Sequence, residues 1–229
     1  MTGLSPLSLA QVARSQAIRR QFILKTFNRS DVEIISRESG FSGFYRLDIL
    51  RLRHRLFNGS WGPELQRELF VRHDAVCVLP YDPWEDSVVL IEQVRVGALD
   101  KTERPWLLEL VAGLIDKDES PEEVAHREAQ EEAGLELLSL TPITRYFPSP
   151  GGSDELVYLY CANVDSRGTG GVHGLAEEGE DIRVSLWSRA DALAAVEDGR
   201  IDNAASIIAL QWLGLHADRL RAEAGERPE

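Results

Sequence analysis

Residues 113–135 read GLIDKDESPEEVAHREAQEEAGL, and this stretch decides the fold. A Ser-Pro-x-Glu run at residues 120–123 has the form of a capping box with proline at the first helical position. Gly134 is a natural helix stop. The stretch therefore predicts a helix over residues 121–133, which directly follows a predicted strand, WLLELVAGLI, at residues 106–115.

The predicted helix carries an acidic face. Glu128, Glu131 and Glu132 stand at helical spacing i, i+3 and i+4, whereas alanines line another face. Charged helix faces are usually solvated, and the helix taken alone favours that interpretation. Three like charges this close nevertheless cost stability unless Arg127, another base or a cation compensates them. Because the ligands are all oxygen, a cation held here would be a hard divalent ion, Mg²⁺ or Mn²⁺.

The spacing of the stretch favours the metal site. It matches the Nudix box pattern G-x5-E-x7-R-E-U-x-E-E-x-G-U at Gly113, Glu119, Arg127, Glu128, Glu131, Glu132 and Gly134, with Ala129 and Leu135 at the two U positions. The chain thus resembles Nudix hydrolases, whose chemistry is metal-assisted hydrolysis of a nucleoside diphosphate linked to another moiety. The resemblance implies an α+β fold, a Nudix α/β/α sandwich with a mixed sheet, preceded by a small antiparallel N-terminal β unit.

The resemblance also implies a metal-ligand set. Its members are the backbone carbonyl of Ala112 and the side chains of Glu128, Glu131, Glu132 and Glu180, with Glu131 as a ligand or a close partner of one. Arg127 would orient the carboxylates by charge-assisted hydrogen bonds. Glu119 is expected to be structural rather than a ligand.

Residues 165–181, DSRGTGGVHGLAEEGED, form a glycine-rich acidic loop. The glycines give the loop freedom to close, and its glutamates are expected to have no packing role. By resemblance, Glu178 is the general base that activates water. Without the box, a flexible solvated loop would be the preferred interpretation.

Five further segments resemble bacterial ADP-ribose pyrophosphatases: LRHRLFNGS at 52–60, VVLIEQVRV at 88–96, SPGGSDE at 149–155, GLAEEGEDIRV at 174–184 and IDNAASIIALQWL at 201–213. This likeness implies hydrolysis of ADP-ribose to AMP and ribose 5-phosphate, and Pro150 stands at a position that marks ADP-ribose enzymes. The implied substrate-binding residues are Phe44, Arg67, Arg95, Gly113, Leu114 and Glu155. The alternatives are a pyrophosphatase for GDP-mannose or ADP-glucose and a non-catalytic ADP-ribose sensor, although sensors usually lose box glutamates.

The charge distribution is unfavourable for binding nucleic acid. The chain has 229 residues and net charge −13, and residues 1–30 hold five basic side chains and no acidic one. The remainder holds 20 basic and 38 acidic side chains, a net charge of −18, which repels nucleic acid. Residues 8–27 predict a short amphipathic helix, with an organellar transit peptide as the alternative.

No run of about 20 apolar residues predicts a membrane span. Cys77 and Cys161 lie in apolar runs without a Cys or His partner, so we expect reduced core thiols in a cytoplasmic protein.

The remaining pattern predicts three domains: a basic helical extension at 1–30, a dimerising β unit at 31–72 and a catalytic domain at 73–229. Strands are expected at 31–38, 41–57, twice within 73–96, and at 138–147, 155–164 and 182–188, with helices at 189–199 and 203–223 and a frayed tail at 224–229. In the resembling enzymes the N-terminal strands exchange between two subunits, which implies a homodimer with a shared adenine site.

Overall fold

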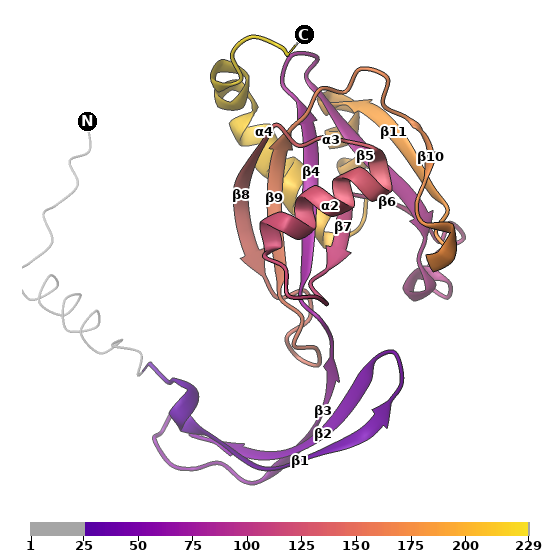
Figure 1. Cartoon of the computed structure of the whole chain (residues 1–229). Coiled ribbons are helices and arrows are strands. Elements are labelled where there is room, and N and C mark those ends of the chain that lie inside the picture. The colour runs from indigo at the N-terminus through magenta and orange to yellow at the C-terminus, as the bar shows by residue number, and fades with distance from the viewer. Residues whose placement is uncertain (1–25, 229) are drawn as a thin grey trace, which may run out of the picture. The chain divides into compact units, whose positions relative to one another are not determined.

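The structure is a computed structural model that describes residues 26–228, with the backbone alone for Glu178. The helix predicted at residues 8–27 lies, except for its last two residues, outside the described part, as does the segment that a transit peptide would occupy. The chain divides into two compact units, one within Met1–Leu69 and the other within Phe70–Glu229. Each unit has its own sheet (Figure 1).

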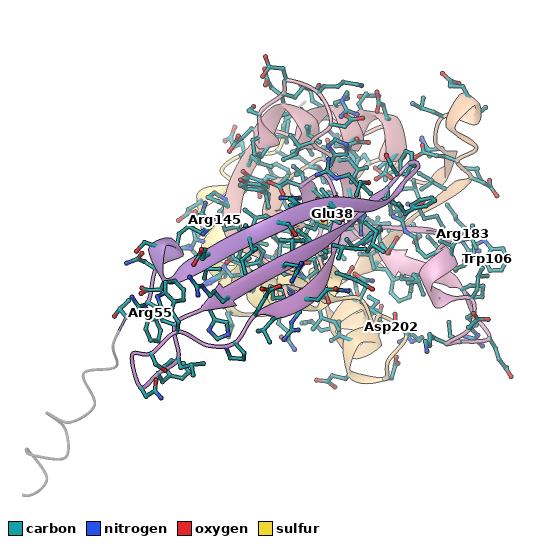
Figure 2. The ribbon with its side chains drawn as sticks, turned by 90° about the horizontal axis from the view of Figure 1, so that it is seen from below. Glu38, Arg55, Trp106, Arg145, Arg183 and Asp202 are labelled. Carbon is teal, nitrogen blue, oxygen red and sulfur yellow. The ribbon has the colours of Figure 1, made fainter. Side chains whose placement is uncertain are left out.

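The first unit is a three-stranded sheet in the order β1-β2-β3, preceded by the 3₁₀ turn η1 (Arg29–Asp31). The strands are β1 (Val32–Ser42), β2 (Arg46–His54) and β3 (Leu65–Val71). The first two pair antiparallel, with Arg37 opposite Leu50, and Figure 2 shows them side by side with Arg55 at one end. The predicted strand at 41–57 is not a single strand, because residues 41–42 end β1, a turn at residues 43–45 reverses the chain, and β2 ends at His54.

The second unit holds an eight-stranded sheet with six strands in the order β10-β11-β5-β4-β9-β8. Their bounds are β4 Ala75–Asp82, β5 Ser87–Val94, β8 Ser139–Tyr146, β9 Val157–Asn163, β10 Gly171–His173 and β11 Ile182–Ser188. The sheet is mixed, since β4 runs parallel to β9 while the other pairs along it are antiparallel. Every residue of β4 is buried, as expected for a strand covered on both faces.

The segment predicted as one strand at 106–115 is two strands, β6 (Trp106–Glu109) and β7 (Val111–Leu114). The cause is that β4 and β5 pair with each other only near their shared turn, where Tyr81 lies opposite Val88. Beyond that point β6 pairs with β5 and β7 pairs with β4. The single predicted strand thus divides its hydrogen bonds between two partners, and β7 is placed in the middle of the sheet.

Helices cover both faces of this sheet (Figure 1). On one face, α2 (Pro121–Ala133) packs Val124, Ala125, Ala129 and Ala133 against Val76, Val78, Ile91 and Val111. On the other, α3 (Arg189–Glu197) and α4 (Ala204–Glu223) pack against Leu79, Leu90 and Leu159. These layers confirm the predicted α/β/α sandwich with a mixed sheet and an antiparallel unit before it.

The sequence predicts two buried, reduced cysteines and no membrane-spanning segment. Cys77 and Cys161 are free and buried, and burial raises the pKa of each thiol to about 12. Within residues 26–228, no helix is both long enough and apolar enough to cross a membrane.

Residues 224–228 follow α4, and the prediction that they fray is wrong. The Arg227 guanidinium forms ion pairs with Asp82, Glu85 and Asp165, and Trp84 Nε1 donates a hydrogen bond to the Gly225 carbonyl at 3.1 Å. The short polar composition of the segment gave no sign of these carboxylate partners, which lie far away in the sequence.

Candidate active site where the glutamate helix meets the sheet

The ends of α2 are set by the residues that predicted them. The Ser120 hydroxyl accepts a hydrogen bond from Glu123 N, and the Glu123 carboxylate accepts one from Ser120 N at 2.7 Å. Gly134 has φ 63°, a left-handed conformation that favours glycine, and its N–H donates to the Ala129 and Gln130 carbonyls. The bounds Pro121–Ala133 are therefore confirmed.

The acidic face of α2 lies against β7 rather than in solvent. Ala112 N donates a hydrogen bond to Glu132 Oε2 at 2.9 Å. A Cβ on Gly113 would lie 1.9 Å from Glu128 Oε1, so this position of β7 admits the carboxylate only because it is glycine. The predicted residues Ala112, Gly113, Glu128 and Glu132 are thus brought together.

Burial dominates the electrostatics of these carboxylates. Glu132 is 3% exposed, and burial raises its pKa to about 8, with Glu128 and Glu180 adding to the shift and the Ala112 amide opposing it. Burial also raises the pKa of Glu128, where Arg127 opposes the shift and Glu131 and Glu180 add to it. Repulsion between the carboxylates thus adds to the effect of burial on both pKa values. A cation bound beside them would offset this repulsion.

Arg127 joins three of the box glutamates. Its guanidinium contacts Glu119 at 3.1 Å, Glu128 at 2.7 Å and Glu131 at 3.1 Å. These charge-assisted contacts restrict the orientations of the Glu128 and Glu131 carboxylates. Glu119 therefore helps to orient these carboxylates indirectly, through its contact with Arg127.

The loop that follows β9 is less open than the sequence suggested. Its middle residues form β10, which pairs with β11 through Val172 opposite Arg183. Glu180 has a structural contact, because its Oε2 accepts a hydrogen bond from Leu175 N at 3.0 Å, so the expectation that it has no packing role is wrong. The backbone of Glu178 lies in the 3₁₀ turn η3 (Ala176–Glu178), which ends at Gly179 with φ 73°.

The donor chemistry of this cluster fits a hard divalent cation. Glu128, Glu132 and Glu180 offer only oxygen atoms, and the buried Glu132 accepts its hydrogen bond from a neutral amide. As they stand, the described side chains include no group of three or more His, Cys, Asp or Glu arranged to hold a metal ion. Glu128 Oε1 accepts a hydrogen bond from Arg127 Nη1 at 2.7 Å.

Besides Gly113, three predicted substrate contacts belong to the second unit, Arg95, Leu114 and Glu155. Arg95 follows β5 and pairs with Glu109 of β6 at 2.7 Å. Glu155 is buried and pairs with Arg72 at 3.2 Å; burial raises the pKa of Glu155, and Arg72 opposes the shift. Leu114 packs partly against the core on the α4 side.

Sequence reasoning missed both ionic partners, Glu109 and Arg72. Glu109 is the one charged residue in the apolar segment at 106–115, and that isolated charge was the signal that it has an ionic partner. Arg72 directly follows β3 (Leu65–Val71), a strand that was not predicted.

The other two predicted substrate contacts belong to the first unit. Phe44 is 85% exposed in the turn between β1 and β2, with its ring 4.7 Å from that of Tyr45 in an edge arrangement. Arg67 is exposed on β3 and donates a hydrogen bond to the Gln66 carbonyl at 2.7 Å. Exposed aromatic and guanidinium groups of this kind can stack on a nucleobase.

A hollow of about 560 Å³ opens at the edge of the sheet formed by β5, β6, β10 and β11. It is lined by Glu92, Glu103, Arg104, Trp106, Val172, Asp181 and Arg183. Figure 2 shows Trp106 and Arg183 near each other on this edge. The predicted metal ligands do not line this hollow, so it is separate from the carboxylate cluster.

The sequence and the fold of this chain are similar to those of known proteins. The model of the NUDIX domain matches residues 71–210. An ADP-ribose pyrophosphatase of Escherichia coli K12 is 53% identical over 198 residues, covering 86% of this chain and 95% of that protein. A GDP-mannose pyrophosphatase of Yersinia pestis is 38% identical over 153 residues, covering 66% and 75%. A solved structure titled as an ADP compounds hydrolase superposes with a TM-score of 0.65 at 22% identity, covering 86% of this chain and 98% of that one, and it supports the fold.

Proposed function

The chain belongs to the NUDIX domain family of hydrolases, and from that membership we propose that it splits the diphosphate of ADP-ribose to AMP and ribose 5-phosphate. The observation that carries the proposal is the carboxylate cluster of α2, in which Glu132 is buried and Glu128 packs on β7 at a position that only glycine leaves open. The 53% identity to an ADP-ribose pyrophosphatase supports the substrate.

The proposed metal is Mg²⁺ or Mn²⁺, held by the Ala112 carbonyl and by Glu128, Glu131, Glu132 and Glu180. When bound, such an ion neutralises diphosphate oxygens and orients the attacking water. The chain's own residues prepare this site before the substrate arrives. Arg127 restrains two of the carboxylates, and the Ala112 amide restrains Glu132.

Glu178 is the proposed general base, because it lies in the loop that also carries Glu180. It would accept a proton from water as the water attacks phosphorus. Gly113 and Leu114 on β7, with Arg95 and Glu155, are the proposed substrate contacts in the second unit. Arginine suits this role because its guanidinium can bind two diphosphate oxygens at once.

We assign a different role to each of the three predicted segments. Residues 73–229 would carry catalysis, and residues 31–72 would dimerise and contribute Phe44 and Arg67 to an adenine site shared between subunits. Residues 1–30 are proposed as a basic extension. Two buried, unpaired thiols support a reducing, cytoplasmic location.

A second candidate is a pyrophosphatase for GDP-mannose or ADP-glucose, and the GDP-mannose pyrophosphatase relative favours it. That relative is less similar over a shorter part of the chain, so we place ADP-ribose first. A non-catalytic ADP-ribose sensor is third, because every acidic position of the box is present.

The substrate test is chromatographic analysis of products from ADP-ribose, ADP-glucose, GDP-mannose and diadenosine polyphosphates, each with and without Mg²⁺. We expect AMP and ribose 5-phosphate from ADP-ribose at the highest kcat/KM, and only with the metal. Turnover that survives exhaustive chelation would refute the proposed metal dependence. Faster hydrolysis of GDP-mannose would make GDP-mannose, rather than ADP-ribose, the proposed substrate. Binding of ADP-ribose without products would favour the sensor.

The assignment of the base is tested with matched glutamine variants of one loop. A positioned base contributes about 10² to 10⁴ in rate, so Glu178→Gln should lose kcat on that order while metal affinity is retained. Glu180→Gln should weaken metal binding first, and extra Mg²⁺ should partly restore its turnover. A dead Glu177→Gln beside a normal Glu178→Gln would move the base by one residue.

A further inference from the structure

Arg227 lies in the segment after α4 and is anchored by three carboxylates. Its Nη2 contacts Asp82 Oδ2 at 2.9 Å and Asp165 Oδ1 at 2.8 Å, and its Nη1 contacts Glu85 at 2.6 Å. The guanidinium also lies over the Trp84 ring, 5.8 Å from its centroid. The side chain is only 21% exposed, and Figure 1 shows this end of the chain beside the turn that joins β4 to β5.

The deepest of these partners, Asp82, also holds the start of the glycine-rich loop. Asp82 is 0% exposed, and its Oδ2 accepts hydrogen bonds from Ser166 N at 3.0 Å and Ser166 Oγ at 2.7 Å. One carboxylate oxygen thus contacts both the loop and Arg227. A buried carboxylate left without its cationic partner is costly, so the guanidinium and the loop are linked through this group.

A second connection runs directly from the segment to the loop. Arg167 donates a hydrogen bond from Nη2 to the Pro228 carbonyl at 2.8 Å, and it also pairs with Asp165. Arg227 and Pro228 therefore contact Asp165 and Arg167 directly, and Asp82 links Arg227 to the residue between them. Gly168, which has φ 76°, follows immediately.

The anchored residues lead straight to the proposed catalytic loop. After Gly168 the chain forms β10, and His173 at its end lies against the C-terminus of α2, where a Cβ on Gly134 would be 3.2 Å from the imidazole. Glu180 follows seven residues later and folds back to accept a hydrogen bond from Leu175 N. Asp165, Arg167, Gly134, His173 and Pro228 line one hollow of about 460 Å³.

We propose that Arg227 is a positioning residue for hydrolysis. Its ion pairs with Asp82 and Asp165 fix the first residues of the glycine-rich loop. Through β10 and the turn after it, the fixed loop keeps Glu178 and Glu180 in place relative to α2. This inference rests on the proposed function. It assigns a role in the reaction to a segment that contributes no group to the carboxylate cluster.

The test compares Arg227→Ala and Arg227→Lys with the parent chain. A misplacement of about 1 Å can cost about 10²-fold in rate, and we expect Arg227→Ala to lower kcat about 10-fold while KM changes less than about twofold. Lysine supplies one point charge instead of a fork, so Arg227→Lys should recover part of the loss. Amide hydrogen exchange should become faster in residues 166–175 of Arg227→Ala.

The matched control is Arg219→Ala, which removes an exposed arginine that pairs with Glu223 within α4. It should leave kcat and loop exchange unchanged. All assays are made well below each variant's melting temperature, so that loss of fold does not enter the comparison. Faster loop exchange with unchanged kcat would overturn the positioning role, and a fall in kcat without faster exchange would overturn the route through the loop.

The parent chain's turnover separates the two hypotheses. A parent that hydrolyses no nucleotide sugar refutes the proposed function and the positioning role together. An active parent beside an Arg227→Ala variant with normal kcat and normal exchange refutes the positioning role alone.

Discussion

Gly113 has no side chain, and the site depends on that. An added Cβ would meet Glu128 Oε1 at 1.9 Å and Cδ at 2.2 Å, distances that no packed structure tolerates. The carboxylate therefore occupies the volume that any other residue on β7 would fill. The glycine of the motif is thus explained by close approach rather than by a turn.

Gly113→Ala should abolish most turnover, because Glu128 must leave β7. We expect kcat to fall by about 10²-fold or more, since displacement of about 1 Å has that effect, and overpacking to lower stability by about 1–3 kcal/mol. Steady-state kinetics and urea unfolding measure the two effects. The control is Gly214→Ala in α4, where the new Cβ would meet Leu193 at an ordinary 3.6 Å and activity should be retained. A fully active Gly113→Ala would show that Glu128 can move without loss.

Asp86 makes the fold sensitive to acid. It stands in the turn between β4 and β5 at φ 52°, and it accepts hydrogen bonds from Arg189 Nε at 2.8 Å and Tyr81 Oη at 2.7 Å. The hydrogen bonds from Arg189, opposed by burial, hold the pKa of Asp86 below its ordinary value of 3.8. A carboxylate with a depressed pKa stabilises the fold above that ordinary value and loses its contribution as pH falls through the folded-state pKa.

Asp86→Asn should therefore destabilise the protein at neutral pH and matter less in acid. Asparagine tolerates the left-handed conformation, so the loss reports the charged hydrogen bonds, about 1–3 kcal/mol at pH 7. Urea unfolding of both proteins from pH 7 down to pH 2 should show the gap closing below the ordinary pKa of 3.8. A gap independent of pH would mean that the charge of Asp86 contributes nothing.

At the scale of elements, α2 depends on its first turn. The reciprocal hydrogen bonds between Ser120 and Glu123 satisfy backbone donors that the helix leaves unpaired. Ser120→Ala should lower the free energy of unfolding by about 1 kcal/mol. Ser120→Asp keeps an acceptor at the helix N-terminus and should lose much less. Thermal unfolding of the three proteins measures the difference, and equal melting temperatures would show that packing alone holds the helix.

Elements whose signals are local could be predicted from the sequence, and elements that depend on distant partners could not. The cap and stop of α2 lie within fifteen residues and fixed its bounds. By contrast, β3 has polar or charged residues at 66–68 and no clear alternation, and it forms a strand because β2 supplies the hydrogen bonds. The division of β6 from β7 likewise follows from the separation of β4 and β5, which sequence spacing does not encode.

The same limit applies to the candidate site. Helical spacing placed Glu128 and Glu132 on one face, but it suggested a solvated surface where the structure has a buried one. Burial comes from β7, and the motif resemblance, rather than periodicity, indicated that contact. The anchoring of residues 224–228 had no local signal at all, because Asp82 is more than 140 residues away in sequence from Arg227.

At the scale of the whole molecule, the first unit presents many apolar side chains to solvent. Ile34, Ile35, Phe41, Phe44 and Phe57 are all exposed within the described part of that unit. Within residues 26–69 of this unit only Asp48 and Leu50, both on β2, are buried, so the described part of its three-stranded sheet has little core. Exposed apolar surface on a long sheet edge is unfavourable in isolation and usually marks a contact with another chain.

We therefore predict a homodimer that forms through the first unit. Light scattering should give about twice the chain mass of 25.6 kDa, and Phe41→Glu, at a β1 position that is 63% exposed, should shift the mass toward the monomer because a buried charge at the contact is costly. Leu215→Glu is the control, as that leucine is 82% exposed on α4 in the second unit. A parent mass near 25.6 kDa would reject the dimer. A dimer that Leu215→Glu breaks while Phe41→Glu does not would instead place the contact on α4, and the adenine site could then not be shared through β1 and β2.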